Sequence, residues 1–328
     1  MATTIKDVAK KAGVGVGTVS RVLNGGKSVN RETKQRVMDA IEELHFVPNQ
    51  MASRLRKDES GLIALLVPVV NHPFFAKLAY FVEDEADKFG YSVLLVSSQK
   101  RMEKEKNILQ QIRRREVDGA IFVTHYDHAE NELKDCPLVS IDRPLGKDIP
   151  YVTSDNYDAT KNALEYLVKK GCKRIGYVGS KPLVDSEVLK REDAYLDVMK
   201  EHGLPICIKN DVILHGDESN VVSEFLQDYP DVDGVFASGH TMAQVLYETA
   251  IQKGIRIPEQ MQIVAYDGSF RQWSNNPFLT CVEQPIEEMA RVVVRLLIDK
   301  IEGKEVQLRT MLKTNFLIGL TTKESKEN

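Results

Sequence analysis

The sequence predicts a small all-α helix-turn-helix headpiece followed by an α/β core of two parallel-sheet subdomains. The first 45 residues show three short helical patterns. From Leu62 onward the residue pattern changes to apolar strand-like runs separated by amphipathic helices. That alternation is typical of parallel sheets covered by helices on both faces. The chain has 328 residues, of which 42% are hydrophobic, so more than one compact unit is expected.

The first predicted helix begins after Thr3 or Thr4 and continues through Lys11. Either threonine is a suitable N-cap, and Asp7 places a negative charge in the first turn, where the helix dipole favours it. Gly13 is expected to end this helix, because glycine readily adopts the left-handed conformation of a C-cap.

A second helix is predicted over Val16–Leu23 and a third over Arg31–Leu44, with Asn30 as the N-cap of the third. The apolar residues of the three helices are expected to form a miniature core: Val8, Ala9, Ala12, Val14, Val19, Val22, Val37, Ile41 and Leu44. Pro48 then interrupts the chain, and Asn49–Lys57 can form one short helical stretch.

The remaining residues predict strands and helices in alternation. The strand-like runs are Leu62–Val67, Val93–Val96, Ala120–Val123, Leu138–Ile141, Ile175–Val178, Gly234–Phe236 and Ile263–Ala265. Helical stretches between them include Phe74–Phe89, Asn156–Lys169, Val188–His202 and Met242–Lys253. About 265 residues accommodate two such sheets, which places a cleft between them.

Charge is distributed unevenly along the chain. Residues 1–60 contain 11 Lys and Arg against 7 Asp and Glu, a net charge of +4, whereas the whole chain carries −4. A basic end on an acidic body is typical of a nucleic-acid-binding module joined to a non-binding one. The four cysteines form no CxxC motif and no apolar run approaches the ~18 residues of a membrane span, so a reducing cytoplasm is expected and no membrane contact.

Residues 5–24 read IKDVAKKAGVGVGTVSRVLN, a helix, a glycine-containing turn and a second helix. A helix-turn-helix places the start of its second helix in a DNA major groove. The glycines at 13, 15 and 17 follow a helix rather than a strand, which argues against a dinucleotide-binding loop.

This segment, with SVNRETKQRVMDAIEELHFVPNQMASRLR after it, resembles the headpiece and hinge of the LacI/GalR family of bacterial repressors. The rest resembles that family's periplasmic-binding-protein-like core. The resemblance implies double-stranded operator DNA as a partner, with bases read by Val16, Gly17 and Arg21. Phosphate contacts are implied for Thr18, Ser20 and Asn24, and Thr4 is counted with the DNA-binding residues. Gly17 departs from the polar residue often found there, so the operator sequence stays open.

The same resemblance assigns Leu55 as a leucine that wedges between base pairs from the minor groove and kinks the duplex. Asn49, Ala52 and Ser53 flank it and are implied to contact DNA as well.

A second set of residues is implied to bind a small-molecule effector, expected to be a sugar or sugar phosphate. These residues are Asn71, Phe74, Asp142, Arg191, His240, Asp267, Trp273 and Gln284. A guanidinium and a carboxylate can each hold two neighbouring sugar hydroxyls, so Arg191 and Asp267 are the strongest pair. Trp273 is proposed to stack on the sugar ring. Gly268 and His240 depart from the family's usual pattern. The runs IDRPLGKDIPYVTSDNY and VEQPIEEMA look most like sucrose-type repressors.

The predicted domains are a headpiece over 1–46, a hinge helix and linker over 47–60, and an effector-binding and dimerisation core over 61–328. The core divides into about 61–155 plus 285–313, and 156–284 plus 314–328. A homodimer is expected, because two headpieces must meet two half-sites.

No cofactor, metal or catalytic residue is expected. His125 and His128 have HxxH spacing but no further cluster, and we expect two solvated histidines in a polar loop. A solute-binding protein would leave residues 1–57 without a role. The remaining alternative is a global catabolite-type regulator whose corepressor is a phosphocarrier protein.

Overall fold

The computed structural model describes residues 3–23, 29–46, 59–99, 101–212, 216–268 and 277–324. The chain forms two compact units, Met1–Ser60 and Gly61–Asn328.

The first unit contains the helices α1 (Ile5–Ala12), α2 (Val16–Leu23) and α3 (Arg31–Glu43). The Asp7 carboxylate accepts hydrogen bonds from the backbone N–H and the hydroxyl of Thr4, at 2.8 and 2.6 Å, and fixes the start of α1. Gly13 ends α1 with φ of 66°, in the left-handed region. Asn30 caps α3 by accepting from the Thr33 N–H at 2.8 Å.

One apolar cluster holds the three helices together, and helix-spaced residues supply it from all three. Its buried members are Val8, Ala9, Ala12, Val19, Val22, Val37 and Ala40, with Val14, Ile41 and Leu44 partly buried against them. The miniature core expected from the sequence is therefore present.

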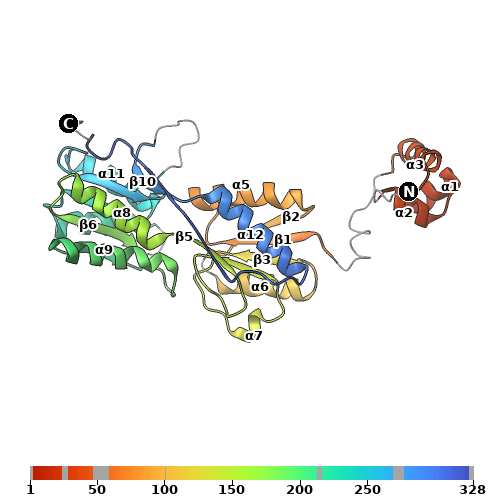
Figure 1. Ribbon diagram of the computed structural model, residues 1–328, viewed down its shortest axis with the longest axis horizontal. Coiled ribbons are helices and arrows are strands. Elements are labelled where there is room, and N and C mark those ends of the chain that lie inside the picture. The colour runs from red at the N-terminus through yellow and green to blue at the C-terminus, as the bar shows by residue number, and fades with distance from the viewer. Residues whose placement is uncertain are drawn as a thin grey trace. The chain divides into compact units, whose positions relative to one another are not determined.

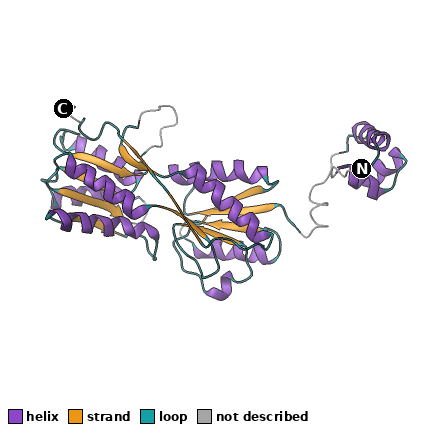
Figure 2. Cartoon of the chain, viewed as in Figure 1, coloured by secondary structure: helices purple, strands orange, loops and turns teal. Residues whose placement is uncertain are grey.

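The second unit contains two six-stranded sheets of the same design (Figures 1 and 2). The first sheet has the order β11 (Arg309–Leu312), β5 (Tyr151–Ser154), β4 (Leu138–Ile141), β3 (Gly119–Phe122), β1 (Leu62–Val67) and β2 (Ser92–Ser97). The second has the order β12 (Asn315–Leu317), β10 (Thr280–Glu283), β9 (Gln262–Tyr266), β8 (Gly234–Ala237), β6 (Ile175–Ser180) and β7 (Cys207–Asp211). All pairings are parallel except that of β10 with β12.

Helices cover both faces of each sheet. In the first lobe, α5 (Pro73–Lys88) and α12 (Ile286–Ile301) pack on one face, and α6 (Met102–Arg113) with α7 (Glu130–Leu133) lies on the other. In the second lobe, α8 (Asn156–Lys169) and α9 (Lys190–His202) cover one face, while α10 (Glu218–Asp228) and α11 (His240–Gln252) cover the other. The buried strands β1, β3 and β8 contain only apolar residues and glycine, as is typical of parallel sheets covered on both sides.

The chain passes between the two lobes three times, from β5 to α8, from β10 to α12 and from β11 to β12. These crossovers are hydrogen-bonded to each other. The Ser154 hydroxyl donates to Gln284 Oε1 at 2.7 Å, and the Asp155 N–H donates to the Leu312 carbonyl at 3.0 Å. Polar residues at the lobe junction are thus held in one network.

The predicted architecture is confirmed, with helices in the first unit and two parallel-dominated α/β lobes in the second. None of the described helices is long and apolar enough to cross a membrane. All four cysteines are buried free thiols.

Candidate functional site

A hollow of about 330 Å³ lies between the two lobes of the second unit. Its walls are the segments that follow the carboxyl ends of strands in both sheets, the position at which open α/β folds bind ligands. Lining residues that carry polar or aromatic groups include Phe74, Thr124, His125, Asp142, Arg143, Arg191, His240, Asp267 and Gln284.

Two aspartates occupy equivalent positions in the two lobes. Asp142 follows β4 and Asp267 follows β9, each the third strand of its sheet. Both have left-handed backbones, with φ of 62° and 63°. Their N–H groups donate to the carbonyls of Val152 and Val282 at 2.9 and 2.8 Å. A left-handed conformation costs a non-glycine residue about 1 kcal/mol, and such strain is concentrated at functional sites.

Asp267 presents one carboxylate oxygen that has no partner within the described structure. Its Oδ2 accepts from Gln284 Nε2 at 2.8 Å, but its Oδ1 is buried without a hydrogen bond. The residue is only 8% exposed, and burial raises the pKa of its carboxyl to about 6, although the charge of Arg191 opposes the rise. At pH 7 the group is ionised and Oδ1 can accept a hydrogen bond from a ligand.

Arg191 lies beside it, at the start of α9, and is 5% exposed. Its Nε donates to Asn156 Oδ1 at 2.7 Å, and one terminal nitrogen donates to the Ser238 carbonyl at 2.6 Å. The guanidinium carbon lies 3.4 Å from the centroid of the Tyr266 ring, a cation–π contact. These contacts fix the guanidinium plane at the cleft wall.

On the opposite wall, Thr153 donates to Asp142 Oδ1 at 2.8 Å. Burial raises the pKa of the Asp142 carboxyl, while the charge of Arg191 lowers it. The Asp142 carbonyl accepts from the Glu187 N–H at 2.8 Å and from the Ser186 hydroxyl at 3.0 Å, which joins the two lobes at the cleft edge. The guanidinium of Arg191 and the carboxylates of Asp142 and Asp267 therefore line the same hollow.

The site residues connect directly to the crossovers. The Ser154 hydroxyl contacts the Tyr266 hydroxyl at 2.9 Å and Gln284 Oε1 at 2.7 Å, and Gln284 in turn donates to Asp267. Asn156 accepts from Arg191 and donates to Thr153 Oγ1 at 3.2 Å. The cleft residues are thus hydrogen-bonded to the segments that connect the two lobes.

Six of the residues proposed as effector contacts line this hollow: Phe74, Asp142, Arg191, His240, Asp267 and Gln284. Asn71 is exposed and is not among the lining residues, whereas its neighbour His72 is, because the loop between β1 and α5 presents His72 there. Trp273 lies outside the described residues. Burial lowers the pKa of His240, so it enters the hollow as a neutral imidazole at pH 7.

The expectation for His128 is wrong. Its side chain is fully buried, and Nε2 lies 2.6 Å from Oε2 of the equally buried Glu105. The loop folds back onto α6, where Glu105 shares the buried helix face with Ile108, Leu109 and Ile112. A glutamate at a core position of an amphipathic helix is the sequence signal that was missed. His125 lines the hollow.

Gly268 follows Asp267 where the family often has a second aspartate, and the structure explains the departure. A Cβ at Gly268 would lie 2.5 Å from Cys281 Cβ and 2.8 Å from Cys281 Sγ. The backbone packs too closely on β10 to admit any side chain there.

In the first unit, the proposed DNA-binding residues at the start of α2 lie on the surface. Val16, Gly17 and Arg21 are exposed, as is Thr4, while Thr18 and Ser20 are half-buried. Gly17 and Arg21 are four residues apart and so share one helix face. The other proposed DNA contacts, Asn24, Asn49, Ala52, Ser53 and Leu55, lie outside the described residues.

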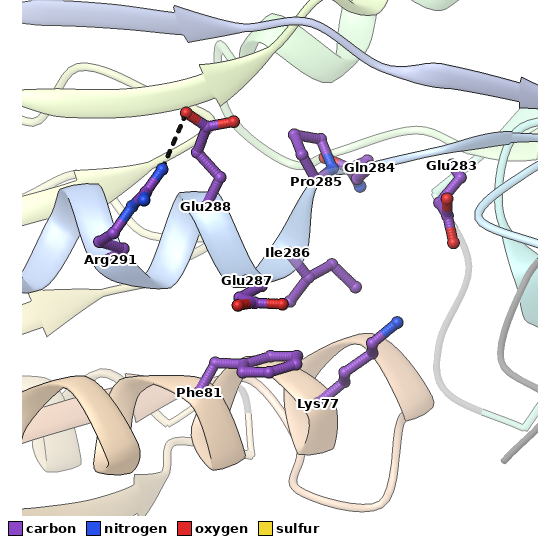
Figure 3. Close-up of a pocket in the computed structure, with 9 residues that line it drawn as sticks. All are labelled: Lys77, Phe81, Glu283, Gln284, Pro285, Ile286, Glu287, Glu288 and Arg291. Atoms are coloured by element: carbon purple, nitrogen blue, oxygen red, sulfur yellow. Dashed lines mark hydrogen bonds and ion pairs between the residues drawn. The ribbon is translucent and has the colours of Figure 1, made fainter.

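A second hollow, also about 330 Å³, lies between α5 and α12 (Figure 3). Lys77 and Phe81 reach it from α5, and Glu287 and Glu288 reach it from α12, where Glu288 pairs with Arg291 at 3.2 Å. Its charged groups are largely solvent-exposed or already paired, so it lacks the buried, converging polar groups of the first hollow.

A helix-turn-helix unit followed by a two-lobed α/β unit with a hollow between its lobes is typical of DNA-binding transcription regulators. Residues 4–49 match the family described as bacterial regulatory proteins, lacI family. Residues 60–319 match the family described as periplasmic binding proteins and sugar binding domain of LacI family. The chain belongs to the LacI family, which consists of DNA-binding transcription regulators rather than enzymes.

Individual relatives agree with this assignment. The chain is 38% identical to a ribose operon repressor of Halalkalibacterium halodurans, over 99% of each chain. It is 30% identical to a sucrose operon repressor of Streptococcus mutans, over 97% of this chain and 99% of the relative. A solved complex of the transcriptional regulator CelR with cellobiose is 28% identical, has a TM-score of 0.71, and aligns with 97% of this chain and 99% of its own.

Proposed function

We propose that this protein represses a sugar-utilisation operon and that a sugar bound in the cleft between the lobes changes its affinity for operator DNA. The observation that carries the proposal is Asp267 Oδ1, a buried carboxylate oxygen for which the described part of the chain supplies no hydrogen-bond donor. A buried acceptor left unpaired costs about 1–3 kcal/mol. A sugar hydroxyl supplies the missing donor, and Arg191 and Asp142 are placed to bind further hydroxyls.

The relatives support ribose as the first sugar to test and sucrose as the second. The ribose repressor is 38% identical to this chain and the sucrose repressor 30%, and the solved CelR complex contains cellobiose. Sucrose is also tested because the runs IDRPLGKDIPYVTSDNY and VEQPIEEMA look most like sucrose-type repressors. Phosphorylated sugars are tested alongside, because Arg191 and Arg143 both line the cleft.

For the DNA contacts, we propose that α2 enters the major groove and that Arg21 binds a guanine edge, the commonest specific contact. Val16 packs on a thymine methyl, while Gly17 has no side chain with which to read a base. Thr4, Thr18, Ser20 and Asn24 bind phosphates. Leu55, flanked by Asn49, Ala52 and Ser53, wedges into the minor groove.

A homodimer is part of the proposal. The first lobe exposes large apolar side chains on α5 and on the edge strand β2, where Tyr80 is 68%, Leu94 37% and Leu95 44% exposed. An unprotected edge strand with exposed leucines is a surface that a soluble protein normally covers. A second copy covers it and places two headpieces on two half-sites.

The domain assignment follows from this arrangement. The headpiece over 1–46 reads DNA, the segment 47–60 links it to the core, and the core over 61–328 senses the sugar. A sugar that binds one cleft state better than the other shifts the balance between them by its differential affinity. The hydrogen-bonded crossovers carry that shift from the cleft to the relative position of the lobes.

The test is fluorescence anisotropy on DNA from upstream of the protein's own gene and its neighbours, with and without ribose, sucrose, fructose and their phosphates. We expect salt-sensitive binding that one of these sugars changes by at least tenfold. Asp267→Asn is expected to bind the same DNA without responding to sugar, because its amide nitrogen replaces the free acceptor.

Leu55→Ala in the same assay is expected to weaken specific binding far more than binding to random DNA. An equal loss of affinity for specific and for random DNA would contradict the proposal that Leu55 inserts between base pairs. Specific binding that no sugar alters, with tighter binding on adding a phosphocarrier protein, overturns the sugar proposal and supports the protein corepressor.

A further inference from the structure

The cleft loop, Thr124–His128, connects the end of β3 to the segment before α7 and forms part of the cleft wall. Thr124 and His125 line the hollow. Thr124 and the side chain of His128, at the two ends of the loop, are buried, and the loop contains no helix or strand. Its position must therefore come from side-chain contacts.

One carboxylate outside the cleft contacts both ends of this loop. Glu105 Oε2, on α6, accepts from the Thr124 hydroxyl at 2.6 Å and lies 2.6 Å from His128 Nε2. Thr124 Oγ1 also accepts from the Tyr126 N–H at 3.0 Å, which fixes the turn between the two ends. The side chains of Glu105 and His128 are both 0% exposed.

The other side of the loop is held from the end of β4. Arg143, which immediately follows Asp142, donates to the Tyr126 carbonyl at 3.0 Å and pairs with Asp127. Arg143 is itself 5% exposed and lines the hollow. The cleft loop thus lies between a buried glutamate on α6 and a buried arginine next to a proposed effector contact.

A glutamate buried this completely is costly to the fold. Its Oε1 has no hydrogen-bond partner within the described residues, and neither has His128 Nδ1, whose nearest acidic atom is Glu132 Oε2 at 3.8 Å. A glutamine or an apolar residue at 105 would avoid the burial of a charge. The hydrogen bonds that accompany this cost are those of Glu105 with Thr124 and His128, the two ends of the cleft loop.

We propose that Glu105 and His128 are positioning residues for the effector cleft, which hold Thr124 and His125 in the geometry that binds the sugar and discriminates between sugars. The inference rests on the proposed function. A ligand's apparent dissociation constant rises by the inverse of the fraction of protein in the binding-competent state. If the loop without Glu105 occupies its present position in about one molecule in ten, affinity falls about tenfold for a sugar that requires this position, and less for a sugar that the displaced loop still binds.

The experiment measures backbone amide exchange in the cleft loop by mass spectrometry on the full chain without sugar. We expect Glu105→Ala to speed exchange in residues 124–128 at least tenfold. Glu105→Gln, which keeps an acceptor oxygen for Thr124, is expected to restore most of the protection. Glu103→Gln is the matched control, because Glu103 lies exposed on the same helix. Thr124→Val removes the hydrogen bond that the Thr124 hydroxyl donates to Glu105. This variant replaces Glu105→Ala in the exchange measurement if Glu105→Ala does not fold.

Sugar titrations of the same variants give the second measurement. Glu105→Ala is expected to bind ribose about tenfold more weakly than wild type and to change the ratio of ribose to arabinose affinity, which a uniform loss of stability leaves alone. Loop exchange equal to that of Glu103→Gln overturns the positioning role, as does an unchanged affinity ratio. A wild type that binds no sugar contradicts the proposed function instead, and the exchange measurement still decides the role of Glu105.

Discussion

Burial raises the pKa of Asp267 to about 6, so at pH 7 this carboxyl is ionised although it has lost most of its contact with water. Its folded-state pKa lies above the ordinary value of 3.8, and the folded protein therefore binds the proton more tightly than the unfolded chain. The resulting stabilisation is complete below about pH 4 and is lost as the pH rises through 6. Ionised Asp267 is therefore a cost to the folded protein, which the proposed sugar would offset by donating a hydroxyl hydrogen bond.

This cost predicts a pH-dependent difference between wild type and Asp267→Asn. Each unit of pKa shift corresponds to about 1.4 kcal/mol, so the wild type should lose about 3 kcal/mol of unfolding free energy relative to the variant between pH 4 and 7.5. Urea unfolding of the sugar-free proteins at a series of pH values measures the difference. Parallel stability curves for the two proteins would show that Asp267 titrates normally.

The site could be predicted from the sequence only in part. Asp142, Asp267 and Gln284 each follow the end of a strand. Open α/β folds bind ligands at the carboxyl ends of their strands, and this rule together with the family resemblance places the three residues at the cleft. No local pattern reveals that Asp142 and Asp267 adopt left-handed backbones, or that Gly268 lies against Cys281, because both depend on neighbouring strands. His128 was misjudged because its partner Glu105 lies 23 residues away on another element.

At the scale of single elements, the sequence predicts best where periodicity and capping agree. The structure gives α2, α8, β1 and β4 the bounds expected from their patterns. Strands β5, β7, β10, β11 and β12 were not predicted, since they are three to five residues long and several are polar or lie at sheet edges. Such strands owe their conformation to the partner strand more than to their own residues.

Helix α2 carries a prediction at this scale. Gly17 lies inside the helix, and nothing lies within 4 Å of the position a Cβ would take. Gly17→Ala should therefore stabilise the headpiece by up to about 1 kcal/mol and slow amide exchange in α2 without DNA. We expect wild-type α2 to exchange faster free than bound, because DNA orders a helix weakened by glycine.

The matched variant is Gly13→Ala, which also meets open space but has φ of 66°. It should destabilise the headpiece, because the left-handed conformation disfavours a Cβ. Thermal unfolding and exchange of both variants check the pair. If both substitutions shift stability in the same direction, the explanation from backbone conformation is incorrect.

At the scale of the whole molecule, the exposed apolar surface on α5 and β2 leads to a prediction about assembly. Leu95→Asp places a charge on the edge strand and should convert the proposed dimer to a monomer without unfolding the lobe, since Leu95 is 44% exposed. Specific operator binding should fall by more than tenfold, because a monomer meets only one half-site. Sedimentation velocity with anisotropy measures both, and Glu103→Gln provides the control. A variant that stays dimeric places the interface elsewhere.

The three crossovers also have a mechanical meaning. A single connecting segment would let the two lobes rotate relative to each other in any direction. Three connecting segments are joined here by the Ser154–Gln284 and Asp155–Leu312 hydrogen bonds. Such an arrangement would oppose sliding and twisting of the lobes and would leave rotation about a single hinge axis. Two lobes that rotate about a single axis would reach the same closed position whichever ligand hydroxyl forms its hydrogen bond first. Under the proposed function, chemically different sugars would therefore produce one and the same output, and selectivity would depend on the walls of the cleft.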